Sequence, residues 1–203
     1  RALNTNLNLN LRDSLFYIGS KISKKATLSH PDFKSIYSLS KGDTTSKLYS
    51  SIADAPENLI PGLYWWATNH SYYLFSRPVI ERINNRELLE VIMHRINSLN
   101  PDYYYGGTSR FFGRLYTRLP GVDISKSEQY FNQAISNHPD YFGNSVQMAE
   151  FYHQKKGNRE FFHKQLIEVI NKDPYDYPIS FPENIFYQKY AKYLIENEAA
   201  LFE

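Results

Sequence analysis

The sequence predicts an all-α protein, a TPR-like solenoid of helical hairpins with elongated N-terminal helices and a C-terminal capping helix. Small or apolar residues recur twelve, eight and five positions ahead of a proline, which places them on one face of a helix. This pattern ends at Pro101, Pro139 and Pro174, at intervals of 38 and 35 residues. Both intervals lie close to the tetratricopeptide (TPR) period of about 34 residues. The three sets are Leu89, Met93 and Ile96, then Ser127, Phe131 and Ala134, then Phe162, Leu166 and Val169.

The length of 203 residues suits one well-buried helical domain over residues 1–203. Within it we expect N-terminal helices over about 1–100, the clearest repeat units over 101–174 and a capping helix over 175–203. No strand is predicted.

In the first half of the chain, helix signals alternate with prolines. An apolar series with steps of four and three predicts a helix from about residue 7 to 28, which ends before His30-Pro31. The series is Leu3, Leu7, Leu11, Leu15, Ile18 and Ile22. A short helix ended by Gly42 and a second one running to Ala55 should follow, with Asp43, Thr44 or Thr45 as the cap of the second.

Pro56-Glu57 then opens the most aromatic helix of the chain, which continues to Phe75 and is interrupted by Arg77-Pro78. Asn85 is the predicted cap of the next helix, 86–99.

In the second half, helices are predicted over 103–119, 142–155, 159–171 and from about 180 to 200, with a further one after residue 125. Gly113 should let a neighbouring helix approach closely. The predicted caps are two capping boxes, Ser125 with Glu128 and Ser180 with Glu183, together with Asp140. Gly157-Asn158 should form a turn.

Composition excludes several classes of function. The balance of 23 Lys+Arg against 21 Asp+Glu, with a net charge of +2, offers no polyanion-binding surface, so nucleic acid is not an expected partner. Without cysteine there is no disulfide framework, thiol nucleophile or Cys-ligated zinc. No apolar run is long enough to span a membrane. In residues 1–10 leucines alternate with asparagines, which argues against a signal peptide. The start at Arg1, without an initiator Met, predicts a processed N-terminus.

Catalytic and metal motifs are also missing from the sequence. The six histidines show no HxxxH or HExxH spacing, and Gly106-Gly107 follows no predicted strand, so it is not read as a phosphate loop. We therefore expect no metal, no cofactor and no enzymatic activity.

Two groups of residues are candidates for binding. Trp65 and Trp66 diverge by about 100° on a helix, so one should line a groove, unless flanking helices absorb both. Asn69 and Tyr72 follow one turn later and could add hydrogen bonds to an apolar cleft.

The second group lies near the centre of the chain. Arg110 and Arg114 are four residues apart and could present two guanidinium groups to a carboxylate. Alternatively, they form ion pairs with Asp102, Asp123 or Glu128. Tyr105, the last of three consecutive tyrosines, belongs either to an aromatic lip or to a crowded turn between repeats.

The order of motifs identifies a family. Leu63-Tyr64-Trp65-Trp66-Ala67 is followed by the segment 106–116, GGTSRFFGRLY, which runs into Leu119-Pro120-Gly121. Ala149-Glu150-Phe151-Tyr152, Arg159-Glu160-Phe161 and a closing Leu201-Phe202 come next. This series, over roughly residues 10–203, resembles the TAtT family, the TPR-containing T components of tripartite ATP-independent periplasmic (TRAP) transporters.

The resemblance implies a periplasmic accessory protein, usually lipid-anchored, that works beside the substrate-binding P subunit. The anchor itself is not part of this chain, which has no cysteine to carry it. We expect docking through a concave helical face, and an apolar or carboxylate-bearing ligand in an aromatic cleft. That cleft would comprise Trp65, Trp66, Tyr72, Arg110 and Phe111. The aromatic content of 16% suggests self-association, with a homotrimer as the first expectation.

Two other classes of function compete with this expectation. A general TPR scaffold would capture an extended peptide or a C-terminal carboxylate with Asn69, Arg110, Arg114 and Asn144. A hydrolase or lyase would need carboxylates or histidines that converge in one pocket.

Overall fold

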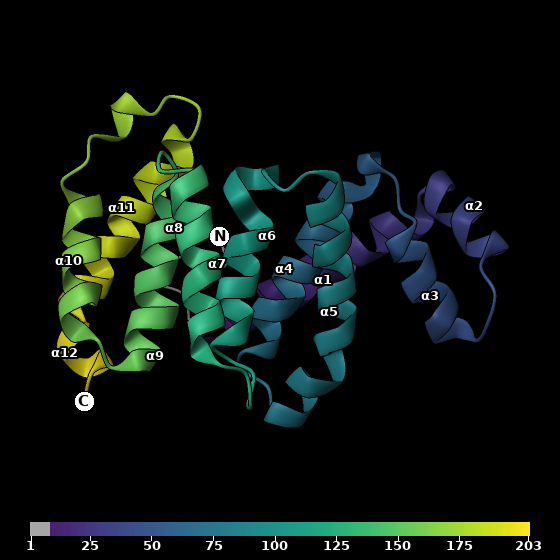
Figure 1. Ribbon diagram of the computed structural model, residues 1–203, viewed down its shortest axis with the longest axis horizontal. Coiled ribbons are helices and arrows are strands. Elements are labelled where there is room, and N and C mark those ends of the chain that lie inside the picture. Colours follow the sequence, from purple (N-terminus) through teal and green to yellow (C-terminus); the bar gives the residue numbers. More distant parts are fainter. Residues whose placement is uncertain (1–8) are drawn as a thin grey trace. The chain divides into compact units, whose positions relative to one another are not determined.

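The computed structural model describes residues 9–203, and all of their regular structure is helical (Figure 1). The helices are α1 (Leu9–Ser29), α2 (Pro31–Leu39), α3 (Thr44–Ala53), α4 (Ile60–Leu74), α5 (Val79–Leu99), α6 (Tyr103–Tyr116), α7 (Ile124–Asn137), α8 (Phe142–Gln147), α9 (Gln154–Lys156), α10 (Arg159–Ile170), α11 (Phe181–Glu196) and α12 (Glu198–Leu201). Two 3-10 turns, η1 (Glu57–Leu59) and η3 (Pro174–Asp176), and a π-helical stretch, η2 (Met148–His153), complete the set. No strand occurs within 9–203, which confirms the all-α prediction, whereas the TPR-like solenoid stays a prediction.

The helices form two compact units. The first runs up to Tyr103 and the second from Tyr104 to Glu203, and each has a buried core of its own. This boundary lies close to residue 100, where the sequence places the start of its clearest repeats. The single domain over residues 1–203 stays a prediction.

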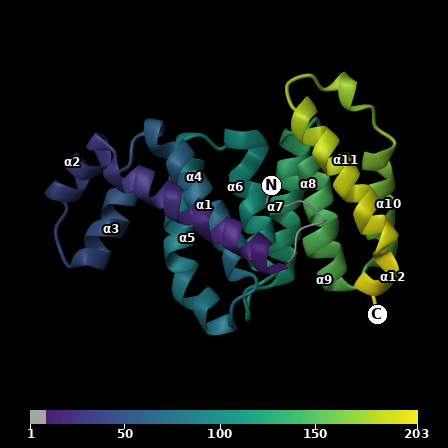
Figure 2. The ribbon, with the colours of Figure 1, turned by 180° about the vertical axis from the view of Figure 1, so that it is seen from behind.

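In the first unit, α1 lies antiparallel along α4 (Figure 2). At one end of the contact Gly62 is so close to Thr27 that a Cβ on the glycine would collide with the threonine hydroxyl. Toward the other end, Phe16 stacks on Tyr72 with ring centroids 4.6 Å apart. The sequence therefore brings these helices together through a small residue at one end and an aromatic pair at the other.

The predicted helix over about 7–28 is confirmed from Leu9 onward, and the part before Leu9, with Leu3 and Leu7, lies outside the described residues. The apolar series that identified this helix is nevertheless largely exposed. Leu11, Ile18 and Ile22 have exposed fractions of 48%, 51% and 63%. The buried residues of α1 are Asp13, Phe16, Ser20 and Thr27. Small Ser20 and Thr27 let α1 approach the bulky residues of α4, which longer aliphatic side chains would hold apart.

The short helices α2 and α3 follow the predicted breaks. The side chain of Asp43 accepts a hydrogen bond from the backbone N–H of Ser46 at 2.8 Å and thereby caps α3. Of the three predicted caps, Asp43 is thus the one used.

Helix α5 begins earlier than predicted. It starts at Val79, directly after Pro78, so the prediction that Asn85 caps a helix at residue 86 was wrong. The Asn85 side chain donates to the Glu81 carbonyl at 2.8 Å and contacts His70 Nε2 at 2.9 Å. Pro78 occupies the N-cap position of α5, and no side chain caps this helix start.

The repeated apolar pattern is confirmed where the sequence placed it. All nine residues of the three sets are at most 1% exposed. One set lies on α5 in the first unit, and the other two lie on α7 and α10 in the second. Gly113 also behaves as expected, since a Cβ there would lie 2.7 Å from the ring of Phe131.

Helix α6 differs from the prediction at both ends. It ends at Tyr116 rather than Leu119, and its first turn is left-handed at Tyr104, Tyr105 and Gly106, with φ values of 51°, 59° and 68°. Left-handed backbone is unfavourable for residues other than glycine, so surrounding contacts must hold the two tyrosines in place.

The predicted caps of the second unit were wrong at three helices. Asp123, not Ser125, caps α7, and its carboxylate accepts from the Ser125 N–H at 2.9 Å. Asn184, not Asp140, accepts from the Phe142 N–H at the start of α8, at 3.0 Å. The second capping box fails as well, because the Ser180 hydroxyl donates to the Asp140 carbonyl instead.

None of the helices within 9–203 is long and apolar enough to cross a membrane.

Candidate functional site

Trp65 and Trp66 have different surroundings, as expected for neighbours on a helix. Trp66 is 2% exposed, and the ammonium of Lys24 lies 5.2 Å from its ring centroid. Trp65 is 37% exposed and meets Tyr64 edge-on at 5.2 Å. Trp65 is therefore the member of the pair that an external molecule can reach.

Asn69 and Tyr72 belong to the contact between α1 and α4. The Asn69 amide donates to the Trp65 carbonyl at 2.7 Å, and its side chain faces Gly19, where an added Cβ would lie 3.1 Å away. Tyr72 stacks on Phe16. Both side chains join helices within the first unit, and their role in ligand binding stays a prediction.

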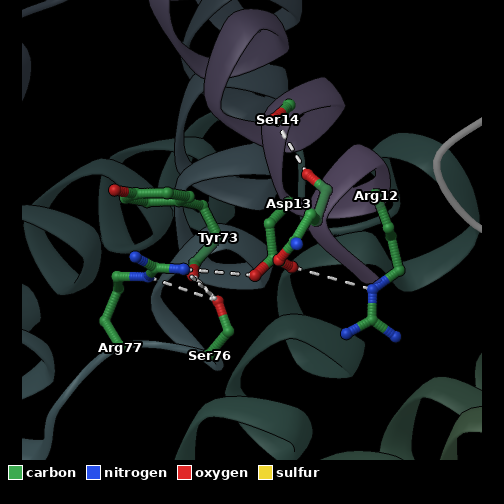
Figure 3. Close-up of polar contacts among 7 residues, drawn as sticks. Arg12, Asp13, Ser14, Tyr73, Ser76 and Arg77 are labelled. Carbon is green, nitrogen blue, oxygen red and sulfur yellow. Dashed lines mark hydrogen bonds and ion pairs between the residues drawn. The ribbon is translucent and has the colours of Figure 1, made fainter. Parts of the chain in front are cut away.

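A polar cluster that the sequence did not predict closes one end of this contact (Figure 3). Arg77 donates to the buried carboxylate of Asp13 at 3.3 Å, and its guanidinium lies 4.9 Å from the ring centroid of Tyr73. The Arg12 Nε lies 3.7 Å from the second carboxylate oxygen of Asp13, which has no hydrogen-bond partner among the described residues. Asp13 falls on the same helix face as Phe16 and Ser20, and this spacing is the signal that could have indicated it.

A pocket of about 410 Å³ adjoins the polar cluster, with Asp13, Arg77 and Tyr17 among its lining residues. Asp13 and Arg77 are the charged residues of its lining, and their opposite charges offset one another.

In the second unit, Arg110 holds the left-handed turn of α6. Its guanidinium is 2% exposed and donates to Asn144 Oδ1 at 2.6 Å and to the carbonyls of Tyr104 and Tyr105, each at 3.0 Å. It also lies 4.7 Å from the ring centroid of Tyr141. These bonds supply the contacts that the strained tyrosines require.

The other predicted residues of this unit are packed in the same way. Arg114 donates to the Gln147 amide oxygen at 3.0 Å, and Gln147 in turn donates to the Tyr187 hydroxyl at 2.9 Å. Phe111 is 1% exposed. Tyr105 stacks on Tyr141 at 4.5 Å and donates to the Ile179 carbonyl.

The eight predicted site residues are thus divided between the units. The first unit contains Trp65, Trp66, Asn69 and Tyr72, and the second contains Tyr105, Arg110, Phe111 and Arg114. The cleft that combines both groups stays a prediction.

The π-helical stretch η2 carries two titratable groups whose pKa values are shifted by burial. Burial raises the pKa of Tyr152, whose hydroxyl donates to the Glu128 carboxylate at 2.6 Å, so the phenol stays protonated near neutral pH. Burial lowers the pKa of His153, which stacks on Phe161 at 5.7 Å. A pocket of about 310 Å³ lies beside them. A protonated phenol is a poor nucleophile, so this network does not indicate catalysis.

Within 9–203, no three His, Asp or Glu residues gather in a group that could hold a metal ion.

Comparison with known families decides the assignment. The family model of TAtT, the TRAP transporter T-component, matches residues 12–202. This range spans both units and nearly the whole chain. The chain belongs to the TAtT family. T components are parts of a transporter rather than enzymes. Among curated proteins, none matches the sequence.

Family membership places the geometry in context. A transporter component needs surfaces for other proteins or for the transported molecule. Trp65 and the exposed side of α1 are accessible features of the first unit, whereas Arg110 and Arg114 are buried in the second.

Proposed function

We propose that this protein is the periplasmic T component that docks on the substrate-binding P subunit of a TRAP transporter. The observation that carries the proposal is the family match over residues 12–202. TRAP transporters are tripartite, and their substrate-binding P subunit is the expected partner. An all-helical fold without a membrane-spanning helix within 9–203 is compatible with an accessory role.

We further propose that the exposed aliphatic side of α1 forms the contact with the P subunit. Leu11, Ile18 and Ile22 follow one another at helical spacing and are each about half exposed or more. In the view from behind, α1 lies in front of α4 (Figure 2). Contiguous exposed apolar residues mark interaction surfaces, because water contact with them is unfavourable.

Co-purification of the chain with the P subunit tests docking, and a pair of variants tests the surface. Ile18→Asp combined with Ile22→Asp should weaken the complex by about tenfold or more, because it places two charges in an apolar contact. Leu39→Asp is the matched control, since Leu39 is an exposed aliphatic residue of the same unit, on α2. This control should bind like the wild type.

The possible outcomes separate the two parts of the proposal. No complex at micromolar concentrations would reject docking itself. A complex that the double variant leaves intact would keep docking and reject the α1 surface.

Self-association and ligand carriage belong to the same proposal. We expect a homotrimer, which native mass spectrometry of the purified chain would show, and a monomer at micromolar concentration would refute it. The 37% exposure of Trp65 supports a contact with a small apolar or carboxylate-bearing ligand. For the other seven predicted residues, ligand binding stays a prediction.

A further inference from the structure

A second pocket of the first unit lies where the end of α1 meets the hairpin of α2 and α3. Its volume is about 370 Å³, which falls within the range of small-molecule sites. None of the residues predicted to bind ligands lines it. The pocket exists because Pro31 ends α1 and turns the chain, so that α2 and α3 stand beside the last turns of α1.

The floor of this pocket is apolar. Phe33 is 2% exposed and stacks on Tyr37 one helical turn later, with centroids 6.4 Å apart. Leu28 of α1 and Leu48 of α3 complete the floor. An aromatic pair between two leucines suits an aliphatic or aromatic body.

The charged residues that line the pocket are both lysines. Lys24 and Lys34 line it together with the hydroxyl groups of Ser38 and Thr44, and none of the lining residues is acidic. The nearby Asp43 caps α3 and is not one of the lining residues. Within the lining, no negative charge balances the two lysines.

Lys24 is held in place by a predicted site residue. Its ammonium lies 5.2 Å from the centroid of the Trp66 ring, which is buried. A cation held over an aromatic face loses less freedom when it meets a ligand. Trp66 would thus act as a positioning residue for Lys24 rather than as a direct contact.

We infer that this pocket binds a small organic anion that has an apolar body and a single anionic head, such as a carboxylate or a sulfonate. The body would lie on Phe33 and Tyr37, and the head would lie at the rim between the two lysines. The inference does not depend on docking with the P subunit, because it concerns the isolated chain.

Fluorescence titration of the purified protein tests this inference with defined probes. Anilinonaphthalene sulfonate, which combines an apolar body with a sulfonate, should bind with one site per chain and gain fluorescence. Octanoate should displace it at a concentration at least fivefold lower than octan-1-ol, because only octanoate carries the charge.

Three variants locate the site. Ser38→Trp fills the pocket from an exposed rim position and should abolish binding of both probes. Lys34→Ala should weaken octanoate by about fivefold while changing octan-1-ol by less than about twofold. Lys25→Ala is the matched control, since it removes an exposed lysine of α1 that does not line the pocket, and it should bind like the wild type. Circular dichroism would confirm that each variant is folded.

Two results would overturn the inference. One is that octanoate binds no tighter than octan-1-ol, which would show that the lysines do not contribute to binding. The other is unchanged probe binding in folded Ser38→Trp, or in Lys34→Ala if the tryptophan variant does not fold. Neither result depends on whether a complex with the P subunit forms, so failure here and failure of docking are distinguishable.

Discussion

The two units differ in where their arginine and aliphatic side chains lie. The first exposes aliphatic side chains along α1 and has lysines at the rim of an apolar pocket. The second buries Arg110 and Arg114 and satisfies them with Asn144, Gln147 and backbone carbonyls. Charge in the second unit thus fixes the backbone, whereas exposed apolar surface in the first is available to other molecules. Residue type alone does not indicate a binding site, since arginine is internal here and isoleucine is exposed.

Removal of Arg110 should have the largest effect on stability. Arg110→Ala removes the guanidinium that donates to Asn144 Oδ1 and to the Tyr104 and Tyr105 carbonyls, of which Tyr105 keeps a bond from the Asn144 amide at 3.3 Å. The free energy of unfolding should therefore fall by about 4 kcal/mol. Urea denaturation followed by circular dichroism measures this. Arg86→Ala, which removes an exposed pair with Glu90, should cost only about 0.5 kcal/mol. Equal effects of the two substitutions would refute the structural role of Arg110.

Two substitutions on α1 compare its inner and outer sides. Phe16→Ala removes a ring that stacks on Tyr72 and should lower the free energy of unfolding by about 3 kcal/mol. Ile18→Ala, two residues later on the exposed side, should change it by less than about 0.5 kcal/mol. A large loss for Ile18→Ala would mean that this side of α1 packs within the protomer and is not a docking surface.

A substitution at the close approach of α6 and α7 should have a smaller effect on stability. Gly113→Ala would place a Cβ 2.7 Å from the ring of Phe131, and this overpacking should cost about 2 kcal/mol. Adding Phe131→Leu should recover part of that loss, because it makes room for the new methyl group. Thermal or urea unfolding of the single and double variants measures the loss of stability and its partial recovery. If the stability losses of the two single variants simply add in the double variant, the contact between these residues is contradicted.

The smallest expected effect is on the pH dependence of stability. Burial lowers the pKa of His153 from its usual value of 6.5 in the folded protein, so the unfolded chain takes up a proton first on acidification. Stability should therefore fall as the pH drops from 7.5 to 5.5, and His153→Phe should reduce this slope. A slope that is identical in the wild type and in His153→Phe would exclude this role of His153.

Spacing within a helix could be predicted, and long-range partners could not. The sets around Met93, Phe131 and Leu166 are buried as expected because steps of three and four fix a helix face whatever surrounds it. For α1 the same spacing correctly predicts the helix, but it does not predict which side of the helix packs against α4. That side depends on small residues that fit against α4, and an aliphatic series does not show them.

Caps and arginine partners were the weakest predictions for a related reason. Ser125, Asp140 and Ser180 have suitable side chains near helix starts, but none of them caps its helix. The cap of α7 is Asp123, a local residue, whereas Asn184 accepts from the Phe142 N–H and Ser180 donates to the Asp140 carbonyl across distant parts of the sequence. Arg110 finds Asn144 on another helix, 34 residues later, and holds tyrosines in a left-handed turn that no local propensity would indicate. Only the folded chain brings these groups together.

Hydrogen–deuterium exchange of the chain with and without its P subunit tests the central claim most directly. The account predicts slower exchange on binding in peptides that cover residues 11–22 of α1, with little change over α6. Formation of a complex without protection of α1 would contradict the assignment of the docking surface to the first unit.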